Sequence, residues 1–184
     1  MKLLHHPAAV GRTRRTLIVE MLGSMDAQWA ASEDLGRAGA GTTAQLAPGP
    51  GYTSAGMMTL RRIVASICYE HVRELFSLPA PDRLMPQVFP VAMTGSRDRP
   101  PHQRPHTDSN RGIHPLVTSV YYARMQDTDG GAVILGGGTA QRIVEPREDD
   151  LIAFPGDTVH AVGNLYAGER LSVVCNFYLS TGNS

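Results

Sequence analysis

The stretch GAVILGGGTAQRIVEPREDDLIAFPGDTVHAVGN, residues 131–164, decides the fold. Short runs of β-branched and apolar residues alternate in it with turns rich in Gly, Pro and Asp, which is the pattern of antiparallel strands. The same texture begins after Pro86 and continues almost to the end of the chain. It predicts seven short strands: QVFPVAMTG (87–95), PLVTSVYYAR (115–124), GAVILGG (131–137), QRIVEP (141–146), DLIAFPG (150–156), HAVGN (160–164) and RLSVVCNFYLS (170–180). Strands of this number and spacing indicate a β-sandwich or barrel.

The residues before this region favour helices. Apolar residues recur at helical spacing over Thr16–Ala31 and, more strongly, over Met57–Leu78, where Pro79 ends the pattern. Residues 33–56 are rich in Gly, Ala, Thr and Pro and are expected to form a loop or extended pieces. We therefore predict a mainly β protein with supporting helices. It would be a single domain over 1–184, with 1–85 as helical support and loops and 86–184 as the β core.

The overall composition limits the classes of partner that this protein is expected to bind. The 184 residues contain 17 basic and 17 acidic side chains, and this balance argues against a nucleic-acid partner. No run of 18 apolar residues is present, so no membrane partner is expected. The first residues lack the apolar core of a secretion signal, and two cysteines are too few for a disulfide framework. These features favour a cytoplasmic protein with reduced thiols.

A candidate metal site lies in the predicted β region. In an extended strand, His106 and Asp108 point to the same side, roughly 7 Å apart along the chain. His160 follows the turn at 155–157. Two histidines and one carboxylate on one face of an ion are the pattern of non-haem Fe(II) oxygenases, and three positions of the metal stay open for a co-substrate and O₂.

A candidate anion site follows ten residues after His160. Arg170 begins the last apolar strand, and Ser172 would share its inward side. A buried guanidinium is costly unless it meets an anion, and its planar fork suits a carboxylate. The partner that we expect is the distal carboxylate of a keto acid bound to the iron.

These motifs in this order resemble the 2-oxoglutarate/Fe(II)-dependent dioxygenase superfamily, with a texture closest to prolyl-hydroxylase-type members. The resemblance covers roughly residues 86–180 and rests on an ordered set: His106-Thr107-Asp108, Val120-Tyr121-Tyr122, Gly130-Gly131-Ala132-Val133, Glu145-Pro146 through Phe154, His160 and Arg170. It implies a double-stranded β-helix (jelly-roll, cupin-like) core. It also implies His106, Asp108 and His160 as iron ligands, and Arg170 as the 2-oxoglutarate anchor, with Ser172 and Tyr122 as helpers. A register slip of one residue would exchange Tyr122 with Tyr121.

The resemblance implies an enzyme that uses Fe(II), 2-oxoglutarate and O₂. It would hydroxylate, or otherwise oxidise, an unactivated C–H bond while decarboxylating 2-oxoglutarate to succinate. The short chain and neutral charge favour a small-molecule substrate, such as an amino acid or a natural-product intermediate. The alternatives are a protein or peptidyl hydroxylase, a nucleic-acid dealkylase, and a cupin-like binding module without catalysis. The superfamily pattern does not cover residues 1–85, so either the substrate lid is short or another subunit of a homo-oligomer supplies it.

Several polar residues remain without a clear role. Arg104, Asn110 and His114 flank the metal motif and are candidates for substrate binding, although ordinary loop polarity explains each one singly. Arg104 is the first choice, because its position two residues before His106 would put it on the same strand face. The run at 148–150 is interpreted as a solvated turn, and the pair at 5–6 as part of a mobile terminus that could bind metal adventitiously.

Overall fold

The computed structural model describes residues 1–24, 29–31, 42–46, 55–110 and 112–180. Helices and strands alternate early in the chain, and strands follow almost exclusively after residue 83. The elements are β1 (Leu4–His6), α1 (Arg12–Gly23), β2 (Trp29–Ala31), β3 (Thr42–Leu46), α2 (Ala55–Phe76), η3 (Pro81–Arg83), β4 (Leu84–Thr94), β5 (Gln103–His106), β6 (Val117–Gly130), β7 (Val133–Leu135), η4 (Gly138–Ala140), β8 (Arg142–Val144), β9 (Leu151–Pro155), β10 (His160–Val162) and β11 (Leu165–Leu179).

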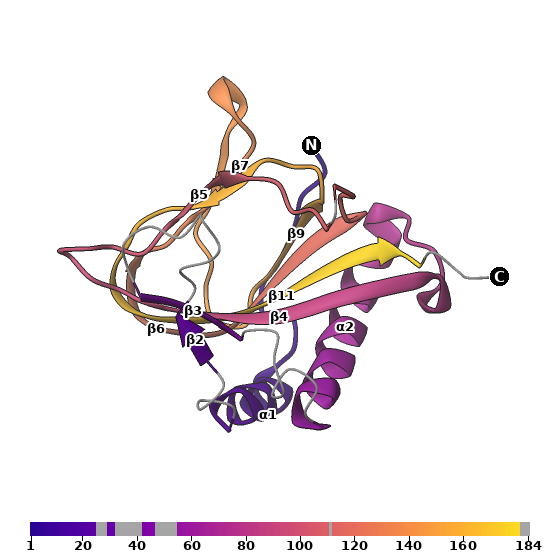
Figure 1. Cartoon of the computed structure of the whole chain (residues 1–184), viewed down its shortest axis with the longest axis horizontal. Coiled ribbons are helices and arrows are strands. Elements are labelled where there is room, and N and C mark those ends of the chain that lie inside the picture. The colour runs from indigo at the N-terminus through magenta and orange to yellow at the C-terminus, as the bar shows by residue number, and fades with distance from the viewer. Residues whose placement is uncertain (25–28, 32–41, 47–54, 111, 181–184) are drawn as a thin grey trace.

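The strands form two antiparallel sheets. The larger sheet has the order β1-β9-β6-β11-β4-β3-β2, and the smaller sheet has the order β5-β10-β7-β8. Figure 1 shows α1 and α2 on one side of the larger sheet and the smaller sheet on its other side. This is the expected jelly-roll core with helical support, and the prediction of a mainly β fold is confirmed.

Strand β11 lies at the centre of the larger sheet and separates two interiors. It pairs with β4 on one side and with β6 on the other. Because successive side chains of a strand point to opposite faces, its two sets of residues go to different places. Leu171, Val173, Cys175 and Phe177 join the helices in the main apolar core. Arg170, Ser172, Val174, Asn176 and Tyr178 face a cavity between the sheets.

One of the two predicted helices is confirmed, and the other is only partly correct. The expected helix over Met57–Leu78 is confirmed as α2, which ends before Ser77, a residue in the left-handed region at φ 53°. The helix predicted over Thr16–Ala31 is wrong in its second half, because α1 ends at Gly23 and Trp29–Ala31 form β2. Strand β2 pairs with β3, which itself extends the larger sheet beside β4. Tertiary strand pairing therefore overrides the local helical spacing.

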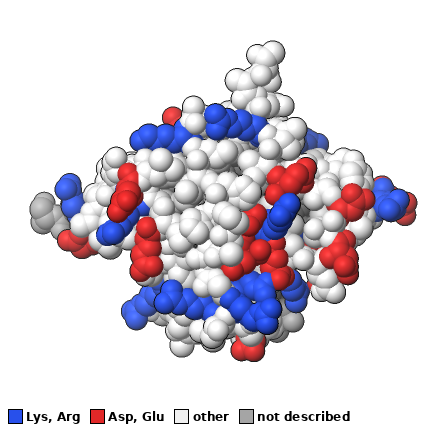
Figure 2. Space-filling view, turned by 180° about the vertical axis from the view of Figure 1, so that it is seen from behind, with Lys and Arg blue, Asp and Glu red and all other residues white. Residues whose placement is uncertain are grey.

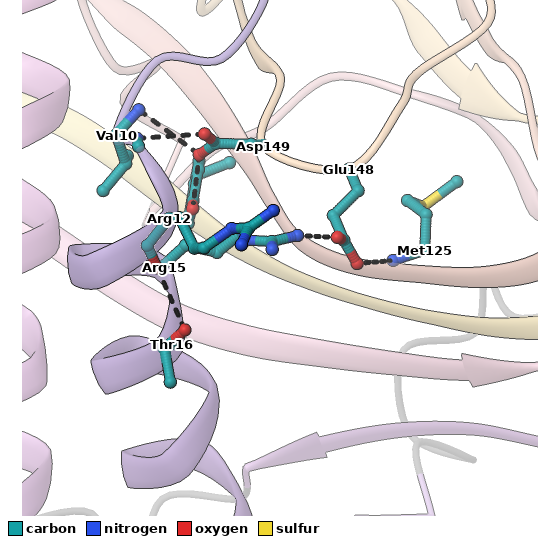
Figure 3. Close-up of polar contacts among 9 residues, drawn as sticks. Val10, Arg12, Arg15, Thr16, Met125, Glu148 and Asp149 are labelled. Carbon is teal, nitrogen blue, oxygen red and sulfur yellow. Dashed lines mark hydrogen bonds and ion pairs between the residues drawn. The ribbon is translucent and has the colours of Figure 1, made fainter.

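The N-terminal segment is fastened to the turn that precedes β9. The buried carboxylate of Asp149 accepts hydrogen bonds from the Tyr121 hydroxyl (2.8 Å), the Gly11 backbone N–H (2.9 Å) and the Val10 backbone N–H (3.3 Å), as Figure 3 shows in part. The carboxylate thus sits at the N-terminus of α1, where the helix dipole favours a negative charge. Because Asp149 is only 8% exposed, the expectation of a solvated turn is wrong for this residue.

The next residue of the turn holds β1 in the same way. Asp150 is 2% exposed, and one of its carboxylate oxygens lies 2.8 Å from both His5 Nε2 and the Arg147 backbone N–H. The histidines expected in a mobile terminus instead lie in β1, which pairs with β9 from Leu4 to His6. Sequence alone carried no sign of these contacts, because the partners stand about 140 residues apart.

Replacing Asp149 by Ala is expected to lower the free energy of unfolding by about 2–4 kcal/mol, because it strands a buried hydroxyl and two backbone donors. Urea denaturation measures this effect. The matched control is Glu148→Ala next to it: Glu148 is exposed, pairs with Arg15 and accepts from the Met125 N–H (Figure 3). Loss of a surface ion pair costs only about 0–1 kcal/mol. If the two substitutions lowered the free energy of unfolding equally, the hydrogen bonds to Asp149 would not fasten the N-terminal segment as described.

Among the described residues, no helix is both long enough and apolar enough to cross a membrane.

Candidate active site

The two sheets enclose a cavity of about 200 Å³ that is partly open to solvent. Its walls come mainly from cavity-facing residues of β4, β6 and β11, and the smaller sheet supplies the opposite wall. The polar lining residues are Gln87, Gln103, His106, Asp108, Ser109, Thr118, Tyr122, His160, Arg170, Ser172, Asn176 and Tyr178. The cavity therefore joins the two candidate sites that the sequence indicated.

The predicted metal triad comes together on the smaller sheet. His106 is the last residue of β5 and His160 the first of β10, and the two are direct partners across the antiparallel pair, with ring centroids 4.2 Å apart. Asp108 follows on the loop after β5. Its carboxylate oxygens lie 3.8 Å from His106 Nε2 and 3.8 Å from His160 Nε2. One ligand atom from each residue falls within 4.8 Å of the others, so the group could hold one metal ion.

Backbone contacts prepare both imidazoles for a metal. The Nδ1 atom of His106 lies 2.8 Å from the carbonyl oxygen of Arg104, and Nδ1 of His160 lies 3.0 Å from that of Thr158. A carbonyl oxygen only accepts, so Nδ1 carries the proton and Nε2 keeps its lone pair. Metal-ligating histidines regularly donate their second N–H in this way, and the bond fixes the orientation of the ring.

The carboxylate of the triad is also oriented. The Thr118 hydroxyl on β6 donates to Asp108 Oδ2 at 3.0 Å, which ties the loop to the larger sheet. His114 Nδ1 lies 2.7 Å from the Asp108 carbonyl oxygen and steadies the loop from its other side. The triad thus consists of two imidazole nitrogens and one ordered carboxylate, a donor set that suits Fe(II).

Arg170 occupies the larger-sheet wall of the same cavity. Its side chain is buried (4% exposed), Nη1 donates to the Gly131 carbonyl oxygen at 3.2 Å, and the guanidinium carbon lies 4.8 Å from the centre of the Tyr122 ring. Nε has no hydrogen-bond partner, and no carboxylate of the described residues forms an ion pair with this cation. A buried cation with a free donor fits a carboxylate ligand.

The structure resolves the ambiguity between the paired tyrosines. Tyr122 faces the cavity, where its hydroxyl lies 3.5 Å from Arg170 Nη2, whereas Tyr121 faces the helices and donates to Asp149. Burial raises the pKa of the Tyr122 phenol above its ordinary value, with Arg170 acting in the opposite direction. The phenol therefore stays neutral and can donate a hydrogen bond. Ser172, opposite Tyr122 in register, lines the cavity and donates to the Val91 carbonyl oxygen at 3.4 Å.

The three residues suggested for substrate binding lie outside the cavity wall. Arg104 is exposed, and its backbone rather than its side chain meets His106. Asn110 forms a backbone bridge with Ile113, and His114 supports the Asp108 loop. On β5 the cavity receives Gln103 in place of Arg104, because the pairing of β10 with β5 shifts register between His160 and Val162.

Sequence reasoning missed six polar residues of the cavity, namely Gln87, Gln103, Ser109, Thr118, Asn176 and Tyr178. The signal was available for two of them. Asn176 and Tyr178 stand six and eight residues after Arg170, so an even spacing in one continuous strand puts them on the same face. Gln87 is the register partner of Asn176 on β4 and needed the sheet topology.

Comparisons with known proteins agree with this geometry. A sequence model described as the 2OG-Fe(II) oxygenase superfamily matches residues 94–178, which include the triad and Arg170. A comparison with curated proteins finds no match.

Solved structures of similar fold cover nearly the whole chain. A prolyl hydroxylase from Trichoplax adhaerens, in complex with a hypoxia-inducible-factor peptide, has 15% identity and a TM-score of 0.67, with 96% of this chain and 83% of that one covered. A prolyl-4-hydroxylase from Pseudomonas putida has 15% identity and a TM-score of 0.66, with 96% and 92% covered. The non-haem α-ketoglutarate-dependent epimerase SnoN from nogalamycin biosynthesis has 15% identity and a TM-score of 0.72, with 97% and 79% covered.

Proposed function

We propose that this chain, which belongs to the 2OG-Fe(II) oxygenase superfamily and is a 2-oxoglutarate-dependent dioxygenase, hydroxylates or otherwise oxidises an unactivated C–H bond of a small molecule. An amino acid or a natural-product intermediate is the substrate class that we favour. The observation that carries the proposal is one cavity that contains both the triad and a buried arginine for which the described residues supply no anionic partner.

Each residue of the cavity has a task in this proposal. When bound, Fe(II) and 2-oxoglutarate supply oxidation by O₂, coupled to decarboxylation of 2-oxoglutarate to succinate. His106, Asp108 and His160 would hold the metal ion. Arg170 receives the distal carboxylate of 2-oxoglutarate, and Tyr122 donates to the same group from its neutral phenol. Ser172 completes this end of the cavity.

The apolar part of the lining excludes water from the reacting centre. Phe154 packs beside the His160 ring at 4.9 Å between centroids, and Val120 and Val174 line the same cavity. Exclusion of water strengthens the charge interactions inside the site and prevents side reactions. The attraction between Arg170 and a bound carboxylate is therefore stronger here than it would be in water.

The charge distribution supports a small-molecule substrate over nucleic acid. The formal net charge is zero, and the face in Figure 2 carries acidic side chains between an upper and a lower band of basic ones. Nucleic-acid binding usually relies on an excess of basic groups. Cys68 and Cys175 are buried, free thiols, which supports a reducing, cytoplasmic setting. We also propose that residues 1–184 form a single domain and that the protein assembles into a homo-oligomer.

A peptidyl hydroxylase is the second candidate. Two of the three similar structures named above are prolyl hydroxylases, and one of them is a complex with a peptide. SnoN, which belongs to nogalamycin biosynthesis, supports the small-molecule alternative. A cupin-like binding module is the third candidate, and it has no use for a complete triad together with Arg170.

A substrate panel separates these candidates. Purified protein with Fe(II), 2-oxoglutarate and O₂ is given amino acids, uncharged natural-product intermediates or short peptides, and succinate and product masses are measured. We expect small molecules to raise succinate formation above the substrate-free rate and to gain one oxygen atom. His160→Ala protein is the inactive control. Stimulation by peptides alone would favour the peptidyl hydroxylase, and failure to bind Fe(II) would favour the binding module.

A further inference from the structure

The polar residues of the cavity fall into two groups along β11. Arg170 and Ser172 lie at one end, and Asn176 and Tyr178 lie at the other. Six residues of a strand span roughly 20 Å, so the carboxylate of 2-oxoglutarate at Arg170 leaves the Asn176 end free. The second group is therefore available to the substrate.

Asn176 is a buried amide with an unused acceptor. It is 3% exposed, and its Oδ1 has no hydrogen-bond partner. Buried polar groups are normally paired, so an unpaired one that lines a cavity points to a ligand that is bound during function. Burial and the Asp108 carboxylate raise the pKa of Tyr178, whereas a hydrogen bond from the Asn176 side chain lowers it.

The neighbours of Asn176 place it beside the reacting centre. Its register partners are Gln87 on β4 and Thr118 on β6, and all three side chains line the cavity. The Thr118 hydroxyl donates to the Asp108 carboxylate of the triad. A group held by Asn176 and Gln87 would therefore sit next to the metal ligands.

The charge of this end of the cavity selects the kind of group. Gln87, Asn176 and Tyr178 are neutral, and Arg170 at the far end is the only arginine or lysine among the described residues that line the cavity. A carboxylate placed at the Asn176 end would therefore meet no arginine or lysine of the described lining and would lie near the Asp108 carboxylate. Two side-chain amides together offer both donors and acceptors, which match a group that itself donates and accepts.

We propose that Asn176 and Gln87 form a subsite beside the triad that receives a neutral amide group of the substrate. This inference rests on the proposed function and narrows it, because a free amino acid presents charged groups whereas an amide-bearing intermediate does not. Asn176 and Gln87 act as specificity-determining residues, and Tyr178 lines the same end of the cavity.

Binding of a matched pair of probes tests the subsite. Propanamide and propanoate differ in one group, a neutral amide against a carboxylate, and propanoate contains no amide. Each is titrated calorimetrically, without O₂, into protein saturated with Fe(II) and 2-oxoglutarate, so that Arg170 is already occupied. We expect the amide to bind about tenfold more tightly, since two neutral hydrogen bonds contribute roughly this much.

Substitutions then assign the preference to the subsite. Asn176→Leu and Gln87→Leu should each reduce it to about threefold or less, whereas Gln126→Leu, which alters an exposed glutamine of β6, should leave it unchanged. Gln87 is half-buried, so Gln87→Leu remains informative if Asn176→Leu fails to fold. Equal or tighter binding of the carboxylate, an unchanged preference in both variants, or no binding of either probe would overturn the subsite. Succinate formation by the same preparations in the substrate panel tests the proposed function separately.

Discussion

Asp108→Ala is expected to lower turnover by more than about a hundredfold, because substitutions of residues that merely support a metal ligand already cost about 10- to 100-fold. The side chain is the only carboxylate of the triad, and its two oxygens face the two histidine Nε2 atoms at 3.8 Å each. Its loss removes both a ligand and the negative charge that offsets the metal. Succinate formation in air measures turnover.

An anaerobic titration with Fe(II) and 2-oxoglutarate shows whether the cause is the metal site. Wild-type protein should develop the weak visible charge-transfer band of a chelated keto acid, and Asp108→Ala and His106→Ala should not. Asp98→Ala, at an exposed position, is the matched control, and Thr118→Val should fall in between because it removes only the bond to Asp108. If wild-type protein bound Fe(II) but developed no band, the conclusion that 2-oxoglutarate chelates the metal in this site would be wrong. Full activity in Asp108→Ala would remove the ligand assignment.

Arg170→Met is expected to weaken 2-oxoglutarate binding by about a hundredfold, because two charge-assisted hydrogen bonds contribute roughly 3 kcal/mol. The same change should leave the protein without 2-oxoglutarate as stable as before, or more stable. A buried cation without an anion costs free energy, and an apolar side chain of similar volume does not. The dissociation constant for 2-oxoglutarate and the thermal midpoint without it measure the two effects.

The opposite signs of these effects separate an anion anchor from a structural arginine. Arg124→Met is the control: Arg124 is partly exposed on β6, pairs with Glu169 at 3.2 Å and should not affect 2-oxoglutarate. Arg170→Lys keeps the charge but loses the planar fork, so an intermediate affinity is expected. Unchanged affinity in Arg170→Met would end the anchor assignment, and a large loss of stability would indicate a structural role.

The secondary structure that depends on the local sequence pattern could be predicted. The strand pattern and the apolar spacing of α2 depend on neighbouring residues, so the jelly roll and that helix could be predicted. The spacing of His106 and Asp108, and the even spacing along β11, similarly bring the candidate residues to one cavity. The choice of Tyr122 over Tyr121 needed the register of β6 against β11.

The rest depended on distant partners. Trp29–Ala31 look helical by spacing, yet they form a strand because β3 offers an edge for pairing. Asp149 looks solvated, yet backbone donors near residue 10 cover it. Arg104 was placed by ideal alternation, and the irregular pairing of β5 with β10 moved it off the cavity face. Such contacts leave no trace in a short window of sequence.

The fastening of residues 4–11 to the turn before β9 bears on how this protein can be engineered. Backbone bonds join Tyr122 to Asp149 and Asp150, so the N-terminal segment and the tyrosine of the anion site brace the same turn from opposite sides. A minimal catalytic fragment that began at residue 86 would lose that brace and uncover the apolar face that the helices shield. Shortening, circular permutation or tag placement should therefore treat the first residues as part of the active-site architecture.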